Sequence, residues 1–132
     1  MTTEIGMQAL LTMSMDHAIE RTTAALKAEG FGVLTRIDVH STFKEKLNVD
    51  FRKYVILGAC NPTLAHRALS ANADVGLLLP CNVTVQEDDG KIAVTAVNPH
   101  NMLGALETDA TVSAVAAEAK SKLERVIAGL KA

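Results

Sequence analysis

The sequence is poor in aromatic residues and has no cluster of positive charge. It contains no tryptophan, aromatic residues make up 3% of its 132 residues, and the formal net charge is -2. Proteins that bind nucleic acids combine a basic surface with rings on which bases can stack. We therefore expect no nucleic acid among the partners of this protein.

The sequence also lacks an apolar run close to the roughly 18 residues that a membrane helix requires. Its first residues, MTTEIGMQALLTMSMDHAIE, have no basic start, long apolar stretch or small-residue cleavage site of a signal peptide. These absences predict no membrane partner and a cytoplasmic location. The two cysteines, Cys60 and Cys81, are then expected to be free thiols, because the cytoplasm is reducing.

The composition is that of a folded chain with a substantial core. Hydrophobic residues make up 48% of the sequence and charged residues 21%, which argues against disorder. A chain of this length is expected to form a single domain, residues 1–132.

Five segments have the apolar or alternating pattern that is typical of strands. The second alternates between a buried face that begins at Val33 and a wetter face that begins at Leu34. The fourth contains Pro80, which suggests an edge or a bulge, and Gly90 then supplies the positive φ of a hairpin turn. The apolar face of the fourth strand is formed by Leu77, Leu79, Cys81, Val83 and Val85. The predicted strands span residues 7–14, 33–40, 54–60, 77–85 and 92–97.

Helices are predicted between these strands and at the end of the chain. The first is capped by Asp16 and stops at Gly30, and a short one follows, in which Thr42 and Glu45 have capping-box spacing. Asn61 is a good N-cap for a third, over residues 62–72, with Pro62 in its first turn. A long apolar stripe predicts the last helix over about 109–130. The eleven residues 98–108 read as a loop that could move or contact a ligand.

The order of these elements favours an α+β fold. It matches a split βαβ-like two-layer domain, with a mostly antiparallel sheet, helices on one face and the C-terminal helix added. Helices on one side leave the other face of the sheet to be covered, and a two-fold homodimer is the simplest way to cover it.

Several segments together resemble a bacterial and archaeal family known as domain of unknown function 302. The resemblance is carried by GFGVLTRIDV, FKEKL, ILGACNP, AHRAL, GLLLPCNV and NPHNML, within a core of about residues 30–102. It implies a small α+β domain that stands alone and is dimeric. It also implies that CNP and LPCNV belong to the family pattern, but the family has no established activity.

Cys60 is the first candidate site residue. A thiol just before a helix N-terminus meets the positive end of the helix dipole, which favours the thiolate. Gly58 and Ala59 leave room for a ligand to approach. Cys60 is therefore a candidate nucleophile, redox group or metal ligand; the alternative is a small residue packed beneath the helix.

Cys81 lies on the apolar face of its strand and reads as a core residue. If its strand were a parallel neighbour of the Cys60 strand, the two thiols could lie within a few ångströms. In the usual split βαβ order, the first strand lies between the two cysteine strands. The cysteines would then be about 9–10 Å apart, which is too far for a disulfide.

The remaining candidates surround these cysteines. His66, one turn into its helix, could join Cys60 and Cys81 in a copper(I) or zinc site, since thiolate and imidazole suit soft metals. Asn61 and Asn82 follow the two cysteines and could cap turns or contact a ligand. An anion at the helix that Asn61 starts is also reasonable.

Three functions remain open from the sequence. The first is a non-catalytic cytoplasmic homodimer that binds a small ligand or soft metal near the Gly58–Pro62 turn. The second is a thiol-dependent enzyme or redox protein that uses Cys60. The third is a structural interaction module with no site. No P-loop, GxGxxG, GxSxG or HExxH motif is present, so whether the protein is an enzyme, and which cofactor it uses, stay undetermined.

Overall fold

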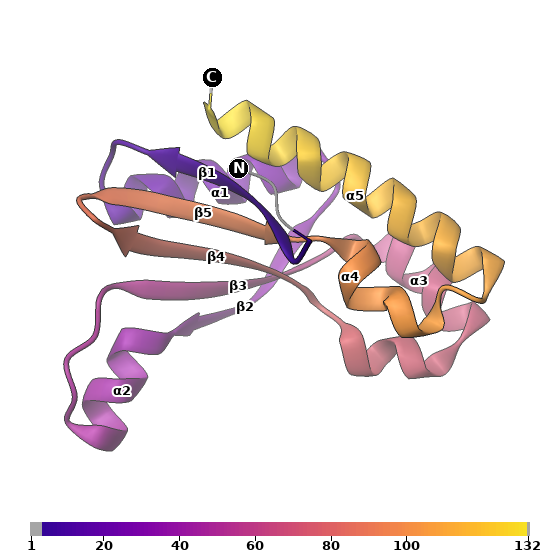
Figure 1. Ribbon diagram of the computed structural model, residues 1–132, viewed down its shortest axis with the longest axis horizontal. Helices are drawn as coiled ribbons and strands as arrows, with labels where there is room; N and C mark the ends of the chain where they lie inside the picture. Colours follow the sequence, from indigo (N-terminus) through magenta and orange to yellow (C-terminus); the bar gives the residue numbers. More distant parts are fainter. Residues whose placement is uncertain (1–3, 132) are drawn as a thin grey trace.

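A single five-stranded sheet organises the chain (Figure 1). The computed structural model describes residues 4–131. The strands are β1 Gly6–Leu11, β2 Gly32–Asp38, β3 Tyr54–Cys60, β4 Cys81–Asp88 and β5 Lys91–Val97. The helices are α1 Met15–Ala28, α2 Val39–Leu47, α3 Pro62–Ala71, α4 Pro99–Leu103 and α5 Ala110–Lys131. Two 3₁₀ helices, η1 Ala73–Leu78 and η2 Gly104–Leu106, complete the described elements.

The strand order is β1-β5-β4-β3-β2, and every neighbouring pair is antiparallel. The predicted α+β fold with an antiparallel sheet and a C-terminal helix is therefore confirmed. The expectation that the first strand lies between the two cysteine strands is wrong, because β1 is an edge strand. The turn at Gly90 (φ 79°) joins β4 to β5 directly, so β4 remains free to pair with β3 on its other side.

One face of the sheet carries the core. Val55, Leu57 and Ala59 of β3 point to this face and are buried, and they lie opposite Val85, Val83 and Cys81 of β4. Helices α1 and α5 contact the strands on this side. The predicted stripe of α5 is buried throughout: Val112, Val115, Ala116, Ala119, Leu123, Val126, Ile127 and Leu130. The C-terminal helix thus covers its own sheet.

The alternation predicted for β2 is broken by a bulge. Val33 pairs with Ala59 and Thr35 with Gly58, so Leu34 is an extra residue. Beyond it, Arg36 and Asp38 lie on the helix side of the sheet, whereas Thr35 and Ile37 lie on the other side. The prediction of one buried face is wrong here, since Ile37 is 49% exposed.

Residues 73–80 are not part of a strand. They form η1 and a turn with a cis Leu79–Pro80 peptide, and β4 begins at Cys81. The sequence misled because its apolar residues are spaced as in a strand, yet Leu77 is largely exposed and Val75 is buried. The Asn72 side chain accepts a hydrogen bond from the Asp74 N–H and thereby starts η1.

The observed helix boundaries agree only in part with those predicted from the sequence. Ser14, rather than Asp16, caps α1 by accepting from the His17 N–H, and Gly30 (φ 85°) ends that helix as predicted. The expected loop 98–108 is instead α4 and η2. The short helix α2 starts at Val39, before the expected capping box, and none of its residues is buried.

Asn61 joins the start of α3 to the end of α1. Its side-chain oxygen accepts from the Leu64 N–H at 3.2 Å, and its Nδ2 donates to the Glu29 carbonyl at 3.3 Å. A Cβ on Gly30 would lie 2.9 Å from this Nδ2, so the close approach requires glycine there. The predicted cap is confirmed, with a second hydrogen bond that local sequence does not reveal.

We expect Asn61→Ala to lower the free energy of unfolding by about 2 kcal/mol, because it removes a helix cap and a tertiary hydrogen bond. Asn61→Asp keeps the acceptor that caps α3 but loses the donor, so it should cost less. Urea unfolding of both variants measures this order. Equal losses would show that the bond to Glu29 contributes nothing.

Gly58 is closed in by two neighbouring side chains. A Cβ there would overlap the Thr35 hydroxyl and lie 2.9 Å from Pro80 Cγ. We expect Gly58→Ala to destabilise the protein by about 1–3 kcal/mol through overpacking. Thr35→Ala should relieve part of this cost in the double variant. Gly32→Ala is the control on β2, since a Cβ on Gly32 meets nothing within 4 Å; a similar loss there would rule out the steric explanation.

Candidate functional site

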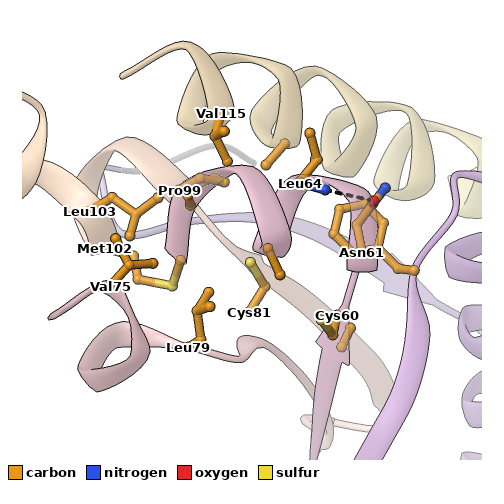
Figure 2. Close-up of a pocket in the computed structure, with 15 residues that line it drawn as sticks. Cys60, Asn61, Leu64, Val75, Leu79, Cys81, Pro99, Met102, Leu103 and Val115 are labelled. Atoms are coloured by element: carbon orange, nitrogen blue, oxygen red, sulfur yellow. Dashed lines mark hydrogen bonds between the residues drawn. The ribbon is translucent and has the colours of Figure 1, made fainter. Parts of the chain in front are cut away.

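A small apolar cavity lies beneath α3, where β3 ends and β4 begins (Figure 2). Its volume is about 30 Å³. Residues of the sheet, α3, η1, α4 and α5 surround it, so segments far apart in the sequence meet here. The lining residues are Phe31, Ala59, Cys60, Asn61, Leu64, Ala65, Ala68, Val75, Leu79, Cys81, Pro99, Met102, Leu103, Val115 and Ala119.

Cys81 is the buried thiol of this cavity. It is the first residue of β4, lies opposite Ala59 and is 7% exposed. Burial raises the pKa of the Cys81 thiol to about 11, and the neighbouring Cys60 adds to this rise. Cys81 is therefore a neutral thiol at physiological pH. Figure 2 shows its side chain extending into the space beneath α3.

Cys60 is the last residue of β3 and is half-buried. Successive residues of a strand point to opposite faces, so Cys60 follows Ala59 onto the face away from Cys81, where it pairs with Gly32. Both cysteines nevertheless line the cavity, and both are free thiols. The structure brings them onto adjacent strands, closer than the sequence predicted, but directs them differently.

The other predicted site residues are dispersed. Asn61 lines the cavity, but both ends of its amide already make hydrogen bonds. Asn82 is exposed on the face away from Cys81, opposite Gly58. His66 is exposed on α3 and is not among the lining residues. Within residues 4–131 no group of three or more His, Cys, Asp or Glu could hold a metal ion, so Cys60, Cys81 and His66 do not form one cluster.

Met102 is the sulfur-bearing lining residue that the sequence did not single out. It belongs to α4, within the segment that was predicted to contact a ligand, and its side chain extends toward the same space as Cys81 (Figure 2). Pro99 and Leu103 of the same helix complete this wall. The contact depends on how α4 packs against α5 and η1, which no local pattern shows.

The walls of the cavity determine its chemistry. None of its lining residues is charged, and the Asn61 oxygen already occupies the Leu64 N–H at the start of α3. An anion would therefore meet neither a cation nor this N–H group. The groups that remain are two thiols and a thioether in an apolar setting, which suit a soft ligand.

Within residues 4–131, no helix combines the length and the apolar character needed to cross a membrane. Among curated proteins, none matches this chain. The structure is similar to the crystal structure of an uncharacterised conserved DUF302 protein from Bacillus stearothermophilus, with a TM-score of 0.86 and 32% sequence identity. The match covers 95% of this chain and 97% of the other. Residues 7–130 match the family described as domain of unknown function DUF302, and the chain belongs to that family.

Proposed function

We propose that this protein is a non-catalytic, homodimeric module that binds a soft metal ion, copper(I), in the cavity beneath α3. The observation that supports this proposal is the meeting of three sulfur-bearing side chains, Cys60, Cys81 and Met102, around one apolar cavity. These residues come from three separate segments of the chain, so their proximity is a product of the fold.

The size of the cavity limits its occupant. Sites for organic ligands typically measure about 300–1,000 Å³, whereas this cavity measures about 30 Å³. A cavity of this size holds an occupant comparable to a water molecule, and its apolar walls offer a water few partners. A single ion fits both the volume and the sulfur groups.

The ligand atoms favour a soft ion over a hard one. Thiolate and thioether sulfur select copper(I), whereas calcium and magnesium take oxygen ligands. The lining includes no carboxylate. The side chains of Cys81 and Met102 extend toward the same space (Figure 2) and supply the two nearest sulfur groups, while Cys60 lines the cavity at the end of β3 but points to the other face of the sheet. Binding exchanges a thiol proton for the ion.

We expect the reduced protein to take up one copper(I) per chain in competition with a chromogenic chelator. Cys81→Ala and Met102→Leu should each weaken the affinity for copper(I) at least about tenfold, because each removes a ligand. Loss of a group that only orients a metal ligand already lowers metal affinity about tenfold or more. Met7→Leu is the matched control, since Met7 is a buried core methionine that is not a lining residue. Absence of uptake, or equal affinity in all variants, would contradict the proposal.

A thiol-dependent enzyme that uses Cys60 is the second candidate. It is favoured by one observation: Cys60 is half-buried, not sealed, directly before the N-terminus of α3, a position that reactive cysteines often occupy. Thiol alkylation distinguishes the two candidates, because a nucleophilic cysteine reacts faster than a free cysteine in an unfolded peptide.

We expect Cys60 to be alkylated at an ordinary rate and Cys81 at least about tenfold more slowly, because only the thiolate reacts. With a pKa of about 11, the Cys81 rate should continue to rise with pH up to that value. Mass spectrometry of the separate peptides gives both rates. A Cys60 rate well above that of the peptide would support the enzyme instead.

A further inference from the structure

We propose that two copies of this chain associate through the face of the sheet that α1 and α5 do not cover, called here the open face. The inference rests on the homodimer proposed above and names its surface. Figure 1 shows β3, β4 and β5 with no helix drawn across their near side. The open face consists of the strand residues that lie on the side opposite Val55, Leu57 and Ala59 of β3.

A row of uncharged side chains crosses the whole open face. Gln8 pairs with Thr95, Thr95 with Thr84, Thr84 with Ile56, and Ile56 with Ile37. The side chains of the neighbouring row, Leu10, Ala93, Gln86 and Tyr54, are also uncharged. One cation borders this row, because Arg52 lies over the Tyr54 ring and donates to Gln86 Oε1 at 3.0 Å. A sheet face that remains in water normally carries charged residues, whereas the centres of interfaces are depleted of charge.

If the open face were in contact with water, the charged residues of β2 would be expected on that face. They lie instead on the helix side of the sheet. Arg36 and Asp38 form an ion pair with each other on the helix side, with 2.8 Å between Arg36 Nε and Asp38 Oδ1. Ile37, between them, points to the open face and is 49% exposed. The bulge at Leu34 produces this arrangement, so β2 directs its apolar residue toward the open face.

The arm formed by β2, α2 and the start of β3 extends the apolar surface. None of the residues of α2 is buried, and Leu47 at its end is 65% exposed. Phe51, in the segment that follows, is 39% exposed and stacks edge-on against Phe43. A nine-residue helix is marginal by itself in water and depends on packing, so this arm needs a surface to cover it.

A second copy of the chain fits this surface better than a different partner. Threonine and glutamine side chains donate and accept hydrogen bonds, so the face can pair with itself. The charged residues at its edge, Asp88 and Lys91, have opposite signs and lie opposite each other on the hairpin. A two-fold axis can therefore bring each acid near a base of the second copy.

The available area is also of the right size. Five strands of about seven residues present a flat area of about 500 Å², given strand spacing and rise, and α2 adds more than about 100 Å². A specific interface buries about 800 Å² of accessible surface on each partner, and the accessible surface of a corrugated face exceeds its flat projection.

Sedimentation of the intact chain at micromolar concentration tests the interface. The wild type should have twice the chain mass of 14.0 kDa. Thr84→Glu, which places a charge at the centre of the open face, should weaken association at least tenfold, as should the near-isosteric Gln8→Glu. Thr84→Ser and Thr111→Glu, the latter at the exposed start of α5, should remain dimeric. Circular dichroism and thermal unfolding verify that each variant is folded.

The outcomes separate this inference from the proposed function. A monomeric wild type overturns both the homodimer and its interface, whereas a wild-type dimer that folded Thr84→Glu and Gln8→Glu leave intact overturns only the interface. Copper(I) uptake is measured on the same samples. A dimeric wild type that takes up no copper(I) would contradict the metal site but leave the proposed interface standing.

Discussion

The arrangement of the helices around the site depends on the hydrogen bonds of one side chain, that of Asn61. It caps α3 and simultaneously binds the last carbonyl of the α1 end, at Glu29. The Glu29 carboxylate in turn binds Arg125 of α5 at 2.9 Å, and this hydrogen bond lowers the pKa of Glu29. Three helices are thus connected at the point where β3 ends. Because Cys60 directly precedes Asn61, the same contacts fix where the cavity lies.

Local sequence predicted the elements whose signals are local. The cap at Asn61, the stop at Gly30, the hairpin at Gly90 and the stripe of α5 depend on neighbouring residues, and each was found where the pattern placed it. The resemblance to the family also held across nearly the whole chain. The prediction of a strand over 77–80 was wrong because Leu77 and Leu79 have the spacing of two that a strand requires, whereas in the structure Leu77 lies in η1 and is largely exposed, and the buried residue of η1 is Val75.

The site was predictable only in part, because it depends on pairing between distant segments. The two cysteines were recognised, but their relation required knowing that β4 pairs with β3 and that β1 is an edge strand. Met102 was hidden because its role comes from the packing of α4 against α5 and η1, and a methionine in a short polar segment has no distinguishing pattern. His66 is the converse case: close to Cys60 in sequence, it lies on the exposed side of its helix.

The bulge at Leu34 has a consequence for how this chain can change its length. Side chains in a strand have a period of two, so an extra residue in a regular strand would reverse the side to which every later residue points. The bulge at Leu34 absorbs such an extra residue without disturbing the pairing that follows it. Removal of Leu34 would let Thr35 follow Val33 directly and still pair with Gly58, so Arg36 and Asp38 would stay on the helix side and Ile37 on the open face. Both substitution and deletion are therefore tolerable here on geometric grounds, since the side chain is 69% exposed, whereas closing the bulge with Leu34 retained would exchange the two sides of β2.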